Sequence, residues 1–360
     1  MSDLDMSELE KGIRNLLFNC ADARTGQRLL IVREDPALGW YDAKLAGAIA
    51  DFAEDAGIIV ETLDVGGPQN DPVPGIAEAA DRNDITLFLA RIGDQGRFEE
   101  PPQGKVRVMS YARDVASLAS PFGTVTHQAM IAAKEAVNRI LLDAEEIHFT
   151  CPQGTDMRGR LSPEERRSDK DVGMRRFPLG VHQPIPARGF SGRVVLTLPL
   201  TPTGSRVYDP PCLFLNDAVT AEVRHGRIEG FDGSPDDVAN VQAHYASVEK
   251  SLGVNPTTVH SWHAGLHPAN ACRHKITEDA DRWSNNIFNN PRFLHLHTCG
   301  EDPPGEIAWM VLDPIVAVDG KPLWQAGALL PWDFAPLRDC LTEWPELAPV
   351  YDNPTQEIGL

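Results

Sequence analysis

The chain has 360 residues, of which 42% are hydrophobic, and it carries a formal net charge of −19. This length accommodates two ordinary domains with full hydrophobic cores. A strongly acidic surface repels nucleic-acid phosphates and anionic lipids, so we expect neither a nucleic acid nor a membrane as a partner.

The first part of the chain alternates strand and helix patterns. Short apolar runs predict four strands, over residues 28–33, 57–63, 84–90 and 105–109. Helical spacing between and after them predicts helices over 44–56, 76–81 and 126–142. Strands separated by helices imply a parallel sheet with flanking helices. We therefore predict an α/β domain over residues 1–145.

The loop after the first predicted strand argues against a nucleotide cofactor. No Gly-x-Gly-x-x-Gly follows that strand, and residues 34–40 read Glu-Asp-Pro-Ala-Leu-Gly-Trp instead. Two acids and a proline cannot cradle a phosphate as a glycine-rich loop does.

After residue 146 the pattern changes to strands joined by glycine and proline turns. We expect strands at 146–150, 193–198 and 309–318, a hairpin over 218–231, a helix over 235–252 capped by Ser234, and an Asp319-Gly320 turn into a strand at 323–325. These elements predict an α+β domain over residues 146–360 that carries the site. The charged segment 162–176 suggests a surface loop or an arm onto a partner subunit. The tail after Trp344 suggests a segment ordered by packing on a neighbouring subunit, so we expect a homo-oligomer.

The cysteines indicate a reducing compartment. The 6 cysteines are scattered and form no Cys-x-x-Cys pair. In a chain of this length, that pattern disfavours a disulfide framework and a structural zinc knuckle. With an acidic, polar N-terminus unlike a signal peptide, it predicts a cytoplasmic protein.

The histidines are concentrated in one block. Of the 11 in the chain, those between residues 260 and 297 are His260, His263, His267, His274, His295 and His297. Imidazole is the commonest protein metal ligand and the commonest acid/base group near neutral pH. We therefore expect the functional site in this block.

Two features of the block suggest a metal site. On a strand, His295 and His297 point to the same face because side chains alternate. Glu306 opens the next apolar strand and can complete a set of two histidines and one carboxylate, which leaves positions open for substrate or oxygen. Solvent-exposed polar residues are the alternative interpretation at each position.

Short motifs in a particular order resemble the leucyl aminopeptidase T-like superfamily. They are Gly154–Asp156, Ser191–Val194, His263–Pro268 and Asp319-Gly320. The group includes metallo-aminopeptidases and the 2,5-dihydroxypyridine 5,6-dioxygenases of pyridine catabolism, and the resemblance covers most of residues 146–330. It implies an iron site at His263, because the dioxygenases carry a histidine where the peptidases have a glutamate.

The chain departs from that group's pattern at the other ligands. The dioxygenases take them from a His-x-Asp motif, where this chain has Glu306–Ala308. Either His295 or His297 supplies a replacement ligand, or the site has lost iron. A replacement set of His263, His297 and Glu306 keeps two histidines and one carboxylate. His260, His267 or His295 then remain as acid/base groups.

We therefore expect a metal-dependent enzyme, with Fe(II) as the leading metal and Zn or Mn as alternatives. The leading hypothesis is an extradiol-type, ring-cleaving dioxygenase acting on a hydroxylated pyridine or similar small aromatic. The alternatives are a metallohydrolase of amide or peptide bonds and a metal-free relative that uses the histidines for acid/base chemistry or ligand binding.

Overall fold

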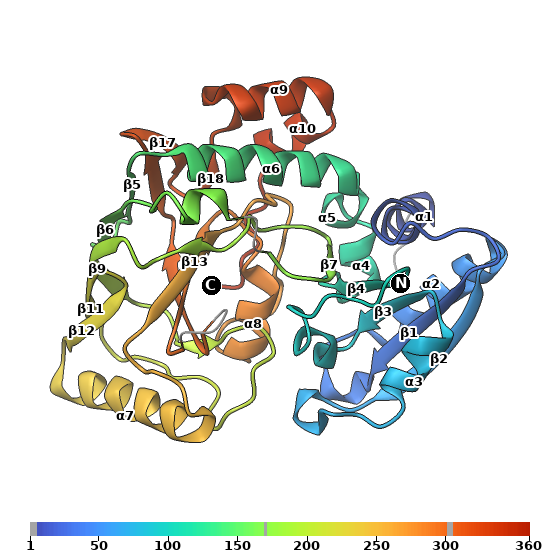
Figure 1. Cartoon of the computed structure of the whole chain (residues 1–360), viewed down its shortest axis with the longest axis horizontal. Helices are drawn as coiled ribbons and strands as arrows, with labels where there is room; N and C mark the ends of the chain where they lie inside the picture. Colours follow the sequence, from blue (N-terminus) through green and yellow to red (C-terminus); the bar gives the residue numbers. More distant parts are fainter. Residues whose placement is uncertain (1–5, 169–170, 301–304) are drawn as a thin grey trace. The chain divides into compact units, whose positions relative to one another are not determined.

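The computed structural model describes residues 6–168, 171–300 and 305–360. It divides into two compact units, Met1–Ile131 with Asp171–Leu179, and Ala132–Lys170 with Gly180–Leu360 (Figure 1). The predicted domain boundary between residues 145 and 146 stays a prediction. In the described part of the chain, no helix combines the length and the apolar character needed to cross a membrane.

The first unit is built on a parallel sheet, as predicted. Its strand order is β2-β1-β3-β4-β7, and each neighbouring pair runs parallel. The strands are β1 (Arg28–Glu34), β2 (Ile59–Val65), β3 (Ile85–Leu89), β4 (Val106–Ser110) and β7 (Arg175–Phe177). The α/β class expected for this part of the chain is thus confirmed.

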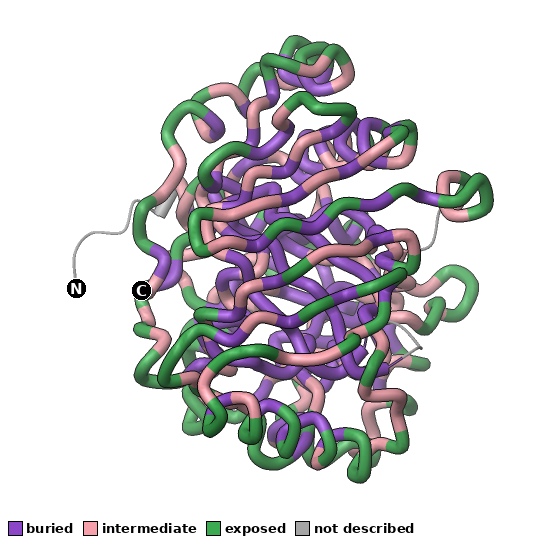
Figure 2. The backbone as a smooth tube through the Cα atoms, turned by 90° about the vertical axis from the view of Figure 1, so that its left-hand side faces the viewer, coloured by how far each residue is buried: buried purple, intermediate pink, exposed green. Residues whose placement is uncertain are grey.

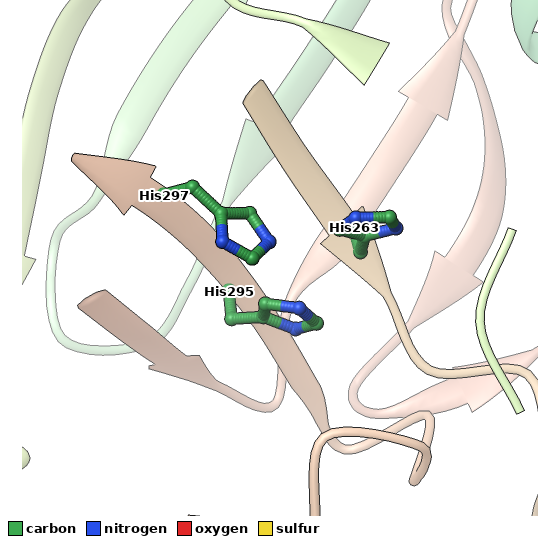
Figure 3. A group of neighbouring side chains, drawn as sticks. All are labelled: His263, His295 and His297. Carbon is green, nitrogen blue, oxygen red and sulfur yellow. The ribbon is translucent and has the colours of Figure 1, made fainter. Parts of the chain in front are cut away.

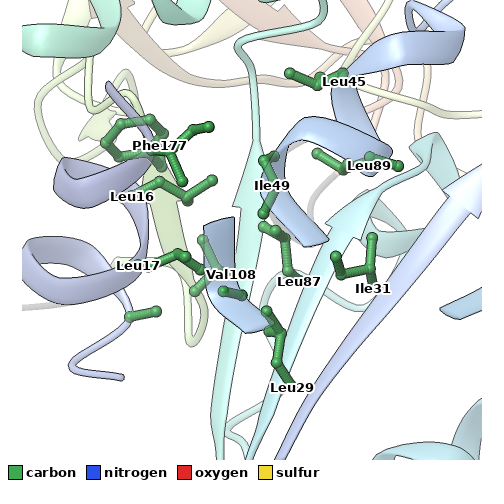
Figure 4. Close-up of a cluster of buried hydrophobic side chains, with 14 of the residues drawn as sticks. Leu16, Leu17, Leu29, Ile31, Leu45, Ile49, Leu87, Leu89, Val108 and Phe177 are labelled. Carbon is green, nitrogen blue, oxygen red and sulfur yellow. The ribbon is translucent and has the colours of Figure 1, made fainter. Parts of the chain in front are cut away.

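Helices cover both faces of this sheet because its inner strands β1 and β3 are apolar and buried on both faces. Leu29 and Ile31 of β1 belong to one buried cluster, and Leu30 and Val32 belong to another on the opposite face. The first cluster includes residues of the N-terminal helices and of α2 (Figure 4). The helical segments of this unit are α1 (Met6–Arg14), η1 (Asn15–Cys20), η2 (Pro36–Leu38), α2 (Ala43–Asp55), η3 (Pro68–Asn70), α3 (Ile76–Arg82), η4 (Arg91–Asp94), α4 (Val115–Leu118) and α5 (Pro121–Thr124).

Strand β7 lies in the segment that the sequence pattern assigned to a surface loop or arm. It has three residues, and its first two are arginines, so it shows no apolar alternation. Arg175 is nevertheless paired with Asp22 at 2.6 Å, and Arg176 with Asp171 at 3.0 Å. The prediction of a loop or arm was therefore wrong for residues 175 and 176, because neutralising partners let this charged strand extend the sheet.

The second unit contains two antiparallel sheets, consistent with the predicted α+β class. The eight-stranded sheet has the order β12-β11-β9-β6-β5-β16-β17-β18, and the five-stranded sheet has the order β10-β15-β14-β13-β8. The strands of the larger sheet are β5 (Ile147–Thr150), β6 (Asp156–Gly159), β9 (Phe190–Leu196), β11 (Val219–Arg224), β12 (Arg227–Asp232), β16 (Ile315–Val318), β17 (Lys321–Gln325) and β18 (Ala328–Leu329). Those of the smaller sheet are β8 (Ile185–Pro186), β10 (Thr201–Pro202), β13 (Val259–Ala264), β14 (Phe293–Thr298) and β15 (Ile307–Leu312).

Helices accompany these sheets. The helical segments are α6 (His127–Asp143), which begins in the first unit, η5 (Glu165–Arg167), α7 (Pro235–Leu252), α8 (Ala280–Ile287), η6 (Pro331–Asp333), α9 (Ala335–Glu343) and α10 (Leu347–Asp352). Figure 2 views the chain from the side of this unit, with buried stretches gathered on inner strands and exposed ones on outer turns.

The smaller sheet has two different faces. On one, the Trp262 ring of β13 packs on Phe149 and Phe190 of the larger sheet, at centroid distances of 5.6 and 6.0 Å. On the other, α8 supplies Trp283, whose ring meets Phe293 of β14 edge-on at 5.4 Å. Because side chains alternate along a strand, the neighbours of Trp262 point to the α8 side. This second face carries the candidate site.

The apolar stretch 309–318 is two strands rather than the single strand predicted. β15 and β16 belong to different sheets, and the chain turns between them at Asp313, whose φ is 50°. Arg292 donates two hydrogen bonds to the Asp313 carboxylate, at 2.6 and 2.7 Å, which fixes this turn. The expected turn at Asp319-Gly320 is present, with φ values of 51° and 80°.

The tail after Trp344 packs on its own chain. It forms α10, and the carbonyl of Ile358 then accepts a hydrogen bond of 2.7 Å from Trp283 Nε1. Ile358 is also part of a buried cluster with Trp283 and Phe293. The expectation that only a neighbouring subunit would order this tail was therefore wrong.

Candidate metal centre

Three histidines meet on the α8 side of the smaller sheet. The antiparallel pairing of β13 and β14 places His263 directly opposite His295, and His297 two residues further along the same strand. All three side chains therefore share one face, and Figure 3 shows their rings gathered beside the two strands. One potential ligand atom from each lies within 4.8 Å of the others.

The three rings form a compact, almost fully buried group. Their centroids are 5.1 Å apart for His263 and His295, 5.1 Å for His263 and His297, and 5.0 Å for His295 and His297. The residues are 6%, 4% and 6% exposed for His263, His295 and His297. Burial of this degree is costly for three polar rings unless their nitrogens bind something.

His182 fixes the orientation of His263. Its own Nδ1 lies 2.6 Å from the carbonyl oxygen of Gln183 and must donate, while its Nε2 accepts from the backbone N–H of Ala264 at 2.8 Å. His263 Nδ1 in turn lies 2.8 Å from the carbonyl oxygen of His182. A carbonyl only accepts, so His263 carries its proton on Nδ1 and keeps the Nε2 lone pair available as a ligand.

His295 is held neutral by its surroundings. The ring of Phe288, the C-cap residue directly after α8, lies 4.4 Å from the His295 ring, centroid to centroid. Burial, with a smaller contribution from His182, lowers the pKa of His295 to about 3. Its Nδ1 is buried and has no hydrogen-bond partner among the described residues. A neutral imidazole with an unsatisfied nitrogen is the form that binds a metal.

The arrangement fits a single transition-metal ion. Metal–nitrogen bonds of about 2.0–2.1 Å place two ligand nitrogens about 3.4 Å apart in a tetrahedral site. Ligand atoms that lie within 4.8 Å of one another reach that spacing by ring movements of less than about 1 Å each. Three imidazoles suit zinc, iron, copper or nickel better than magnesium or calcium. The cluster can therefore hold a metal.

Glu306, the carboxylate expected to complete the site, is not among the side chains of this group. It is bound by the guanidinium of Arg206, with Nη2 of the arginine 2.9 Å from Oε1 and Nε against Oε2. Its backbone carbonyl accepts from Tyr208 Oη at 3.1 Å. The structure thus gives this carboxylate a cationic partner.

Two of the three expected acid/base residues, His260 and His267, also lie outside the group. His260 occupies the extra position of a bulge between Val259 and Ser261, with its Nδ1 2.9 Å from Ser261 Oγ. His267 follows β13 and is fully buried. The third, His295, is a member of the three-histidine group itself. The ligand and acid/base roles assigned from the sequence stay predictions.

Sequence reasoning missed His182. It lies about 80 positions before the histidine block, next to a short strand, and no spacing links it to His263. The pairing of β8 with β13, together with the bridge between Val181 and Gly265, brings the two segments together. A contact of this kind is invisible in local sequence.

No protein-family model and no curated protein sequence matches the chain. The solved structure of 2,5-dihydroxypyridine dioxygenase from Pseudomonas putida matches with a TM-score of 0.58 and 12% identity, over 90% of this chain and 97% of that one. Wild-type AmpT from Thermus thermophilus matches with a TM-score of 0.49 and 13% identity, over 90% of this chain and 99% of that one. The chain therefore shares the fold of that dioxygenase, as the order of motifs from Gly154 to Gly320 indicated.

Proposed function

We propose that the chain is a metal-dependent, ring-cleaving dioxygenase that acts on a hydroxylated pyridine or a similar small aromatic compound. The observation that carries this proposal is the group of three buried imidazoles on one sheet face, His263, His295 and His297. The fold shared with a solved dihydroxypyridine dioxygenase supports it further.

The three histidines would hold Fe(II) and leave the remaining coordination positions open. Bound there, Fe(II) supplies the redox chemistry that ring cleavage by dioxygen requires. The protein side chains keep the site dry and the ligands fixed. His182 locks the tautomer of His263, and Phe288 covers one side of His295 with an apolar ring.

A metallohydrolase is the second candidate, because three histidines with an open fourth position are also a catalytic zinc set. In that case the metal would activate water for attack on an amide or peptide bond. Oxygen dependence separates the two functions. A dioxygenase consumes oxygen with its substrate, whereas a hydrolase works without oxygen and regains activity with zinc, manganese or cobalt.

The test begins with metal analysis of protein purified without oxygen. We expect about one iron per chain in the unmodified protein and in His274→Ala, a control in which a partly exposed histidine is removed. His263→Ala, His295→Ala and His297→Ala should each lose the metal. Oxygen uptake is then measured with 2,5-dihydroxypyridine and related hydroxypyridines.

Each outcome has a clear consequence. Iron lost from all three variants, with oxygen uptake by the unmodified protein, supports the proposal. Zinc with peptide hydrolysis but no oxygen uptake favours the second candidate. No metal after incubation with iron, zinc and manganese excludes both metalloenzymes and leaves a ligand-binding or acid/base role for the cluster.

A further inference from the structure

A second group of charged residues lies in the first unit, at the carboxyl ends of its parallel strands. Glu34 ends β1, Arg91 follows β3 and Arg113 follows β4. Since β1 lies beside β3 and β3 beside β4, the carboxyl ends of these strands meet at one edge of the sheet. From β1 the chain continues to β2 on one side, whereas β3 lies on the other side of β1. The strand order therefore reverses between β1 and β3, and open α/β sheets bind ligands at such a topological switch point.

One ion pair in this group is complete. The buried Glu34 carboxylate accepts from Arg91 Nε at 2.9 Å, from the Arg91 backbone N–H at 2.8 Å, and lies 2.8 Å from its Nη2. The Arg91 guanidinium also lies over the Trp40 ring, 3.9 Å from its centroid. Both charges of this pair therefore have a partner.

Arg113 is different, because no acidic side chain of the described residues pairs with it. The residue is only 6% exposed, and its Nε and Nη1 are buried with no hydrogen-bond acceptor among the residues that the structure describes. Its guanidinium lies 4.7 Å from the Trp40 ring centroid and 5.5 Å from that of Tyr41. Arginine cannot shed its proton in a protein, so the buried charge persists. Aromatic rings offset part of that cost but accept none of the N–H groups.

The neighbouring polar groups are already engaged. Tyr41 Oη donates to the carbonyl of Ser110 at 2.9 Å. The Asp94 carboxylate accepts from Arg97 at 3.1 Å and from Tyr111 at 3.2 Å. Among the described residues, neither group accepts a hydrogen bond from Arg113 Nε or Nη1.

From this geometry we infer that Arg113 is the anchor of an oxyanion-binding site for a small molecule that carries a carboxylate or a phosphate. Arginine presents a planar fork that matches both groups. The absence of a glycine-rich loop after β1 is compatible with this site, because a side chain rather than backbone amides would hold the anion. The site uses first-unit residues alone and does not depend on the proposed function of the histidine cluster.

The test is titration calorimetry of the full chain at constant ionic strength, with inorganic phosphate in one arm and benzoate in the other. We expect saturable binding of at least one probe with a dissociation constant at or below about 1 mM. Arg113→Met keeps an apolar stem against Trp40 and Tyr41 and should weaken that binding at least about tenfold. The control Arg82→Met removes an exposed arginine of the same unit and should leave binding unchanged.

The results separate the possibilities. Tighter binding of benzoate assigns the site to aromatic carboxylates, and tighter binding of phosphate assigns it to phosphorylated ligands. Arg113→Lys keeps the charge without the fork and serves if the methionine variant fails to fold. The inference is overturned if the unmodified protein binds neither probe at concentrations up to about 20 mM. It is also overturned if the Arg113 variants bind the probe as tightly as the Arg82 control does.

Discussion

The burial of His295 makes the stability of the metal-free protein depend on pH. Its pKa is about 3 in the folded chain, against 6.5 for the unperturbed side chain. The unfolded state therefore binds more protons between these values, and stability is full above pH 6.5 and falls as the pH falls towards 3. One pKa unit corresponds to about 1.4 kcal/mol, and the unfolded side chain is half protonated at pH 6.5, so acidification from pH 6.5 to 4.5 should lower the free energy of unfolding by about 2 kcal/mol through this residue.

The measurement is urea unfolding of chelator-treated protein at several pH values, compared with His295→Gln. Tryptophan fluorescence is a suitable probe, because every tryptophan except Trp40 lies in the second unit with the cluster. We expect the unmodified protein to lose about 2 kcal/mol more unfolding free energy than the variant over this pH range. His274→Gln, which removes a histidine with a 39% exposed side chain, should follow the unmodified protein. Equal pH dependence in His295→Gln and the unmodified protein would refute the reasoning.

Other substitutions test individual contacts. Glu306→Gln should leave the metal content unchanged but destabilise the fold by about 2 kcal/mol, because it breaks the ion pair with Arg206. Metal analysis and urea unfolding check the two parts, and loss of metal would instead make Glu306 a ligand. His182→Ala should weaken metal affinity by about 10–100-fold although His263 is retained, because it removes the imidazole that bonds the Ala264 N–H and so holds the His182 carbonyl against His263. Competition with a chelator measures this affinity, and an unchanged affinity would contradict the prediction. Trp262→Ala should lower the free energy of unfolding by about 3–5 kcal/mol, because a fully buried ring between the two sheets is lost. Urea unfolding measures this change, and a loss below about 1 kcal/mol would show that packing between the sheets does not depend on this ring.

Local sequence determined much of the secondary structure. Helix α7 covers the predicted residues 235–252, and Ser234 Oγ accepts from the backbone N–H of Asp237 as expected of its cap. The strands of the first unit were predictable because runs such as Leu29–Val32 are apolar on both faces. These features depend on residues a few positions apart, so the sequence carries them directly.

Tertiary pairing decided the content of the site. The sequence placed His295 and His297 on one strand face, but it could not say that the partner opposite His295 is His263. It also suggested Glu306 as a ligand, whereas Arg206, far away in the sequence, lies against that carboxylate. Register between strands depends on packing across the whole sheet rather than on the composition of either strand. The sequence likewise could not show that the buried Arg113 guanidinium has two nitrogens without an acceptor among the described residues, because that depends on which distant groups the fold brings near it.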